Sequence, residues 1–428
     1  MEKMHLNSAG IDIGSQKIFI GLEGKTVSSY GTFTSEFKRA SMYLKENGIT
    51  SVAMEATGSY WIILYDILVA DGFDVWLVDG RQTRQVPGRK TDVKDCQWIQ
   101  QLHSYGLLNR CFVAEGKMKE LRSYQRLRED HIRSASMHIN HMQKALIEMN
   151  IRLPEVLSQV HGASGIAIIE SILAGERDAE KLLQLCHVSL IKNKSAEILK
   201  ALEGFYTPAG LFALRQAYDG YQFYQRQIAD CDRVLAEVLR EINNDKEDLD
   251  LERRKPIRHN KPDIENLGGQ MVNLFDGKDA TILPGITDYS WMQIYSETGN
   301  DLSKWQTEKH FVSWLGLAPG QHNSGKKKGN RKKGRPSAGQ IFRTLAQSLI
   351  QSKNIAFGAF ARRLKSRKGP GIAIKALARK LAVQYWRLMQ NGVDFIENGV
   401  AEYAEQLKKH QTKYLKKLAV ELGVEVIF

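Results

Sequence analysis

Two aspartates three residues apart, Asp92 and Asp95, lie just after a basic stretch, in the segment TDVKDCQWI. If Thr91 caps a helix that begins there, the two carboxylates lie one turn apart on the same helical face. Acidic residues in a first helical turn are common because they interact favourably with the helix dipole. The pair therefore predicts a helix start, and a chemical role only if other acids lie nearby.

Two other acids stand next to apolar runs that are typical of buried strands. Asp12 lies within GIDIGS, and Glu55 ends the apolar part of VAMEATG. A carboxylate flanked by apolar residues is costly unless it is paired or bound to a cation. Asp12, Glu55, Asp92 and Asp95 can therefore share one site. Hard oxygen ligands of this kind suit Mg²⁺ or Mn²⁺, and two such ions can clamp the attacking and leaving oxygens of a phosphodiester.

A serine precedes the most basic part of the chain. Ser324 lies in APGQHNSGKKKG, where a serine beside a glycine is usually a turn residue. A serine hydroxyl becomes a nucleophile only near a base, a metal or concentrated positive charge. The charge and the phosphate contacts can come from the residues that follow: Lys326, Lys327, Lys328, Arg331, Lys332, Lys333 and Arg335. The position of this run, between GLAPG and a helical segment, favours a site loop over a solvated, nonspecific basic surface.

The four acids need an α/β domain to bring them together. Apolar periodicity over residues 8–80 alternates between strand-like and helix-like patterns. We expect neighbouring strands that form an opening antiparallel hairpin, then helix, strand, helix and strand, over residues 9–24, 25–33, 35–48, 49–58, 61–72 and 73–80. A further helix is expected over residues 92–106.

The middle of the chain predicts long helices with two apolar seams that advance by alternating threes and fours. The first seam is Ile132, Ala135, Ile139, Met142, Leu146 and Met149, and the second is Tyr221, Tyr224, Ile228, Cys231, Leu235, Val238 and Ile242. These are packing surfaces, either of an antiparallel helical arm or of a helical oligomer, and we expect self-association.

Periodicity is lost near residues 243–278, where charge and proline increase, so we predict a linker there. With 428 residues, 43% of them hydrophobic, the chain can form two or three domains. The expected plan is an α/β metal-binding domain (1–120), a coiled-coil-like helical region (121–242), the charged linker (243–278) and a mainly α domain with the serine and the basic loop (279–428).

Charge and cysteine content narrow the class of protein. The formal net charge of +13 is concentrated in clusters, and a focused positive patch attracts nucleic acid. The four cysteines lie far apart without a CxxC pair, which indicates neither a disulfide framework nor a zinc site. No run of about 20 apolar residues indicates a membrane helix or export. We expect a reduced, cytoplasmic protein that does not bind a membrane.

The order Asp, Glu, Asp, Asp, with the first acid on an opening strand, resembles the ribonuclease H and RuvC type of nuclease fold. GIDIGSQKIFIGL, MEATGSYWIILYDIL and GRKTDVKDCQWI, followed by LPGI, FVSWLGLAPGQHNSGKKKG and AIKALARKLAVQYW, resemble the bridge-RNA-guided insertion-sequence transposases. These are described as serine recombinases with a RuvC-like DEDD domain. By motif order, the resemblance covers roughly residues 8–130 and 280–395.

The resemblance implies specific roles and partners. Asp12, Glu55, Asp92 and Asp95 would bind the divalent metals, and Ser324 would be the covalent nucleophile. Implied partners are donor and target DNA, a structured noncoding guide RNA and further copies of the chain. In such a dimer or tetramer, the metal domain of one protomer works with the serine domain of another. The family implies a bacterial or archaeal, nucleoid-associated protein. Thr287 stands where family members carry a glycine after PGI, which weakens the case for a DNA-backbone contact there.

Three alternatives remain open at this point. The first is a metal-dependent RuvC-like nuclease or junction resolvase in which Ser324 is idle. The second is a nonenzymatic nucleic-acid binder, which leaves Asp12 and Glu55 unexplained. The third is a sugar-kinase or actin-like ATPase, because GIDIGS also resembles the first phosphate loop of those proteins. Their second phosphate loop has only a poor counterpart here, in NLGGQMVNLFDG.

Overall fold

The chain forms two compact units, Met1–Val113 and Ala114–Phe428. The structure is a computed structural model that describes residues 2–83, 92–244, 249, 251, 255–319, 323–324, 327–328, 336–352, 356–392 and parts of 405–423. The side chains of residues 92–93, 323–324, 327–328 and 356 lie outside that description. No helix in the described parts is long and apolar enough to cross a membrane.

A five-stranded mixed sheet forms the centre of the first unit, in the order β3-β2-β1-β4-β5. Strands β1, β2 and β3 are antiparallel neighbours, whereas β4 is parallel to both β1 and β5. The strands are β1 (Ser8–Ile13), β2 (Lys17–Leu22), β3 (Ser28–Gly31), β4 (Ser51–Glu55) and β5 (Asp74–Val78). The carboxyl ends of β1, β4 and β5 therefore meet at one edge of the sheet.

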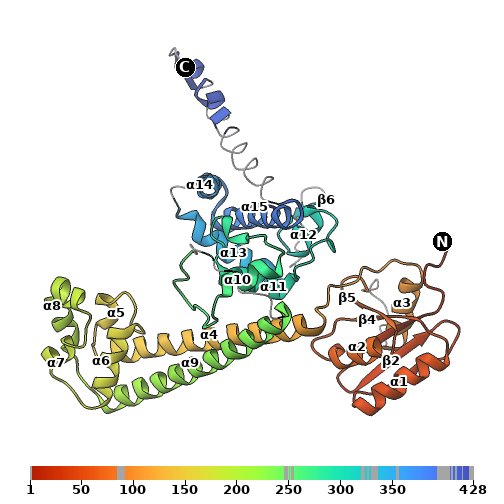
Figure 1. Cartoon of the computed structure of the whole chain (residues 1–428), viewed down its shortest axis with the longest axis horizontal. Coiled ribbons are helices and arrows are strands. Elements are labelled where there is room, and N and C mark those ends of the chain that lie inside the picture. Colours follow the sequence, from red (N-terminus) through yellow and green to blue (C-terminus); the bar gives the residue numbers. More distant parts are fainter. Residues whose placement is uncertain are drawn as a thin grey trace. The chain divides into compact units, whose positions relative to one another are not determined.

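Helices cover both faces of this sheet (Figure 1). Helices α1 (Thr34–Glu46) and α2 (Trp61–Ala70) pack on one face, where alternate strand residues such as Ile11 and Ile20 are fully buried against Leu44 and Leu64. Helix α3 (Asp92–Ser104) packs on the other face, with Ile99 buried against Ala53 and Val78. This is a three-layer α/β domain.

Two glycines let α3 lie unusually close to the sheet. Gly10 on β1 and Gly21 on β2 are paired in register, and both face α3. A Cβ atom at Gly10 would overlap the backbone of Cys96 and Gln100, and one at Gly21 would lie 2.8 Å from the backbone of Cys96 and Gln97. Any side chain at either position would push the helix away, so the glycine pair sets the position of α3 over β1 and β2.

The predicted α/β domain and its order of helices and strands are confirmed, with one correction. Residues 9–24 form two strands, β1 and β2, rather than one, and residues 25–33 supply the third strand, β3. Gly14 and Ser15 stand between β1 and β2, and the Gly14 amide donates to the Lys17 carbonyl oxygen at 2.9 Å. The opening hairpin is thus tighter than the sequence pattern indicates.

Two long helices, α4 (Gly116–Glu148) and α9 (Pro208–Asn243), run side by side in the second unit (Figure 1). Their direction is antiparallel. The Lys117 ammonium lies 2.7 Å from the Glu241 carboxylate at one end, whereas Met149, just after α4, packs against Gly210 at the other. At the far end, the short helices α5 (Leu153–Val156), α6 (Ala163–Leu173), α7 (Ala179–Leu183) and α8 (Val188–Leu202) enclose an apolar core.

This arrangement decides between the two explanations of the apolar seams. Ala135 and Met142 on α4, and Leu235 and Val238 on α9, are at most 5% exposed within a single chain. These residues pack inside an antiparallel arm. The expectation of self-association therefore loses the support it drew from these seams.

The remaining helices form a compact C-terminal part around large aromatic residues. Trp291, Phe311, Phe342 and Tyr385 are fully buried, and the rings of Phe342 and Tyr385 lie 5.8 Å apart. The elements are α10 (Leu267–Leu274), η1 (Ala280–Ile282), α11 (Asp288–Thr298), α12 (Glu308–Trp314), β6 (Asn323–Ser324), β7 (Lys327–Lys328), α13 (Ser337–Ile350), α14 (Ala356–Lys368) and α15 (Pro370–Asn391).

The stretch that we predicted as a linker, residues 243–278, contains one of these helices. Helix α10 buries Leu267, Met271 and Leu274, which recur at intervals of four and three residues and so form one apolar helical face. This part of the stretch packs into the C-terminal core. The correction follows from apolar periodicity that the neighbouring charge and proline obscured.

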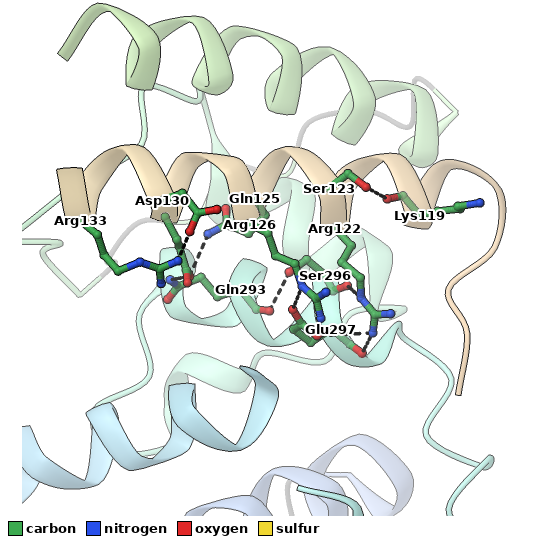
Figure 2. A network of polar contacts seen from close by, with 11 residues as sticks. Lys119, Arg122, Ser123, Gln125, Arg126, Asp130, Arg133, Gln293, Ser296 and Glu297 are labelled. Atoms are coloured by element: carbon green, nitrogen blue, oxygen red, sulfur yellow. Dashed lines mark hydrogen bonds and ion pairs between the residues drawn. The ribbon is translucent and has the colours of Figure 1, made fainter. Parts of the chain in front are cut away.

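A polar network joins α4 to α11 (Figure 2). The Arg126 guanidinium forms a bidentate ion pair with the Glu297 carboxylate, with N–O distances of 2.7 and 2.9 Å. The Arg122 Nε atom donates to the Ser296 carbonyl oxygen at 3.1 Å. Deeper in the protein, Arg128 pairs with Asp232 of α9, and both residues are at most 4% exposed. Charged groups so fully desolvated require this degree of pairing.

At the opposite edge of the first unit from the acids, His103 of α3 is fully buried. Its Nε2 atom lies 2.8 Å from the Ser51 hydroxyl, and its ring stacks on His5 with centroids 4.4 Å apart. Its Nδ1 atom is buried without a hydrogen-bond partner. Burial, and then the charge of His5, lower the pKa of His103 to about 4.

We expect Gly10→Ala to destabilise the first unit by about 1–3 kcal/mol, because α3 has to shift to admit the new methyl group. Amide hydrogen exchange of β1 and β4 in the full chain measures this loss. Gly371→Ala is the matched control, since a Cβ atom there meets nothing within 4 Å. Equal exchange protection in Gly10→Ala and the parent would contradict the close contact.

Acid should destabilise the first unit through His103. Its folded-state pKa lies below the ordinary value of 6.5, so the unfolded chain binds the proton more readily, and stability falls as the pH drops from about 6.5 to about 4. The expected loss at pH 4.5 is about 2.5 kcal/mol. Exchange protection of β4 at pH 7.5 and 4.5, in the parent and in His103→Gln, measures this contribution. The same loss in both proteins would exclude His103 as its source.

Candidate active site

A cavity of about 480 Å³ opens at the edge of the sheet where β1, β4 and β5 end. Three of the four acids predicted from the sequence line it: Asp12, Glu55 and Asp95. They come from β1, β4 and α3, elements that are far apart in the sequence. The fold therefore brings these three carboxylates to one place. The side chain of the fourth, Asp92 at the first position of α3, lies outside the described residues.

The strand register aligns Asp12 with Glu55. Ile11 of β1 pairs with Met54 of β4, so the next residue on each strand is an acid at the same level. Because side chains alternate between the two faces of a sheet, Asp12 shares its face with Gly10, and Glu55 shares its face with Ala53. This is the face that α3 covers.

The Glu55 carboxylate is held in a defined position. The Thr83 hydroxyl donates to Glu55 Oε2 at 2.6 Å, and Thr83 is only 8% exposed. A Cβ atom at Gly80 would lie 2.8 Å from Glu55 Cδ, so only glycine leaves room for this carboxylate. The Trp98 indole of α3 donates to the Thr83 carbonyl oxygen at 3.1 Å. Helix α3 thus supports Glu55 through Trp98 and Thr83.

Helix α3 also supplies Asp95 directly. The next residue, Cys96, is the one whose backbone lies against the glycine pair. Burial raises the pKa of the Cys96 thiol to about 11, and the negative charges of Asp12 and Asp95 raise it further. The thiol therefore stays protonated at neutral pH. The field of both carboxylates acts on the same buried atom, as expected if they lie on either side of it.

A fourth acid in the cavity, Asp79, was missed by the sequence analysis. It follows β5 in VWLVDG, the same pattern of an acid after an apolar run that singled out Glu55. The Arg81 Nε atom donates to both Asp79 oxygens, at 3.0 and 2.9 Å. This ion pair supplies the positive charge that Asp79 needs at the rim, and so distinguishes it from the other acids.

The donor chemistry of the cavity fits a hard divalent cation. The acids offer carboxylate oxygens, the ligands that Mg²⁺ and Mn²⁺ prefer, and the neighbouring thiol is protonated. Among the residues that the structure describes, no three His, Cys, Asp or Glu side chains already lie close enough together to hold one metal ion. A metal site here therefore needs Asp92, or a closer approach of the described acids.

The predicted nucleophile and its basic run lie in the second unit. The backbone of Ser324 belongs to β6, and it pairs in antiparallel register with Lys327 of β7. Lys328 pairs with Asn323 in the same ladder. The side chains of these residues lie outside the described part of the chain, as do the remaining predicted phosphate-binding residues: Lys326, Arg331, Lys332, Lys333 and Arg335.

Comparison with known families places both regions. Residues 9–151 match a family model described as Transposase, the DEDD type of the IS110 group, and residues 280–362 match the model described as Transposase IS116/IS110/IS902 family. Together the two matches cover just over half of the chain. The chain belongs to the IS110 family of transposases. No curated protein matches it.

This IS110-family transposase is an enzyme that acts in DNA strand transfer, and it binds DNA. The first match contains the acids of the cavity, and its DEDD domain is nuclease-like. The second match contains Ser324 and the whole basic run. The matches therefore cover every candidate residue that the sequence analysis singled out.

Loss of a carboxylate from the cavity should remove divalent-cation binding by the transposase. We expect Asp95→Asn to weaken Mn²⁺ binding at least tenfold in calorimetric titration, because the amide keeps the shape but loses the charge. Thr83→Val should weaken it less, because Glu55 loses only the hydrogen bond that holds it. Asp66→Asn, on α2 and away from the cavity, is the control. Unchanged Mn²⁺ affinity in Asp95→Asn would refute the site.

Proposed function

We propose that this transposase cuts and rejoins DNA strands with two sets of groups, the carboxylates of the sheet-edge cavity and the hydroxyl of Ser324. The observation that carries the proposal is the convergence of Asp12, Glu55 and Asp95 on one cavity. The acids would belong to a metal-binding domain (1–120) and the serine to a C-terminal transposase domain (279–428). Between these, residues 121–242 would act as the helical spacer.

The first unit is proposed to be a RuvC-like domain. In support, its sheet has three antiparallel strands followed by two strands parallel to the first, and its acids lie on the first strand, on the fourth strand and on a later helix. Asp12, Glu55, Asp92 and Asp95 would hold Mg²⁺ or Mn²⁺. When bound, such ions stabilise negative charge on a scissile phosphate and on its leaving oxygen.

The residues of the chain have distinct tasks around that charge. Asp12 and Asp95 supply carboxylates from elements that the glycine pair holds together. Thr83 and Gly80 fix the orientation of Glu55, so its carboxylate is preorganised before the cation arrives. Arg81 neutralises Asp79 and so limits the negative charge that repels an approaching phosphodiester.

The covalent step would begin when the Ser324 oxygen attacks the scissile phosphorus. One O–P bond forms while the P–O bond to the leaving deoxyribose oxygen breaks. The serine gives up its proton, and the leaving oxygen gains one. The number of phosphodiester bonds is conserved, so a free hydroxyl of another strand can reverse the step and release the serine without ATP.

Positive charge next to Ser324 favours this role. Lys327 lies opposite Ser324 in the β6–β7 ladder, and the same run of sequence carries Lys326, Lys328, Arg331, Lys332, Lys333 and Arg335. These cations would bind phosphates of donor and target DNA whatever the base sequence. The net charge of +13 leaves capacity for a second polyanion, which we propose to be a structured guide RNA from the element. The reaction would take place in the cytoplasm, at the nucleoid, in a homo-oligomer.

Ser324→Ala should abolish a covalent protein–DNA adduct that the parent forms with labelled DNA in the presence of Mg²⁺. The variant removes one oxygen, so it should fold, bind Mn²⁺ and bind DNA like the parent. Denaturing electrophoresis detects the adduct, and Ser337→Ala, at the start of α13, is the matched control.

Each other outcome of this experiment has a meaning. An adduct at full yield in Ser324→Ala that disappears in Ser337→Ala would move the nucleophile to Ser337. Cleavage by the parent without any adduct would instead favour a metal-dependent nuclease or junction resolvase, in which a water molecule attacks the phosphorus.

A further inference from the structure

A second cavity, of about 710 Å³, lies between α4, α11 and α13 in the second unit. The network in Figure 2 forms one side of it, with Arg126 and Glu297 on the rim. Ser337 and Gln340, at the start of α13, form another side. Ser337 comes two residues after Arg335, the last residue of the basic run. A nucleic-acid strand held by that run would therefore pass near the cavity.

The floor and walls of the cavity are largely apolar. Ile132 of α4 and Ile341 of α13 are half-buried in it, and Leu345 and Tyr289 are 8% exposed. A cavity of this size and lining can hold a flat, mostly apolar ligand, provided that a few polar groups fix its orientation. An unstacked nucleobase has this character.

A buried acceptor supplies such a polar group. Gln125 lines the cavity, is 2% exposed, and its Oε1 atom has no hydrogen-bond partner. Its orientation is fixed, because its amide nitrogen donates to the Glu129 carboxylate at 3.3 Å, and a carboxylate can only accept. A buried acceptor left without a partner destabilises the protein by about 1–3 kcal/mol, so a ligand that donates to it is favoured.

The neighbouring Glu129 carboxylate adds further acceptor character. It also accepts from Gln293 of α11, and it lines the same cavity. An acceptor-rich recess suits a base with an exocyclic amino group, because the amino group donates where a carbonyl group would be repelled. Adenine and cytosine carry such a group on the edge that is exposed when the base is unpaired.

We propose that this cavity binds one unpaired nucleobase with an exocyclic amino group, from the strand that the basic run holds. The inference rests on the proposed function, because it requires nucleic acid at that run. The DNA strand and an RNA strand offer the same chemistry. The cavity would hold the base out of the stack next to the proposed nucleophile and so favour strands with cytosine or adenine at that position.

The test compares single-stranded oligo-dC and oligo-dU of about a dozen nucleotides, which differ at the amino group, in anisotropy titrations of the full chain at pH 8. We expect oligo-dC to bind about tenfold more tightly, as one buried hydrogen bond allows. Gln125→Met removes the acceptor, and Ile341→Trp fills the cavity while Gln125 remains. Both should equalise the two affinities. Gln347→Met, exposed on α13 outside the cavity, should retain the preference.

The outcomes separate the two proposals. Equal affinities in the parent, or a preference that survives in Ile341→Trp, would overturn the base-binding cavity alone. A double change of Lys327 and Lys328 to Ala should weaken both oligonucleotides equally, and failure of the parent to bind either would overturn both proposals. The same series with oligo-C and oligo-U of RNA shows which strand the cavity takes, and a preference in neither series would again exclude the cavity.

Discussion

The close contact between α3 and the paired glycines of β1 and β2 is the constraint on which the candidate site depends. Because Gly10 and Gly21 have no side chains, the backbone around Cys96 lies directly on the sheet. That contact places Asp95 beside Asp12. It also brings Trp98 to the Thr83 carbonyl, and Thr83 in turn holds Glu55. One backbone approach therefore positions the acids of three different elements.

In the second unit, buried charge has the comparable role. Arg128 and Asp232 join the two long helices at almost full burial, and Tyr289 of α11 accepts from Arg128 at 2.7 Å. Removing one partner would leave an uncompensated buried charge, which costs far more than the pair contributes. Helix α4 is thus tied both to α9 and to the C-terminal helices. These contacts fix the walls of the cavity that contains Gln125.

Much of the first unit could be predicted because its signals are local. Apolar alternation located the strands, and an acid after an apolar run singled out Asp12 and Glu55. The same signal was present at Asp79, but its ion pair with Arg81 could not be foreseen. The role of Gly10 and Gly21 also escaped, because a glycine in a strand does not reveal which backbone approaches it. Helix α10 was taken for a linker because charge and proline surround its short apolar face.

The central claim is that the acids positioned by α3 form one divalent-metal site. Anomalous diffraction from crystals of the full chain soaked in Mn²⁺ tests it most directly, because the metal is located without reference to activity. The account predicts an anomalous peak within coordination distance of Asp12, Glu55 and Asp95. Strand cleavage at a Mn²⁺ concentration at which no peak appears at these carboxylates, or a peak only elsewhere in the chain, would contradict it.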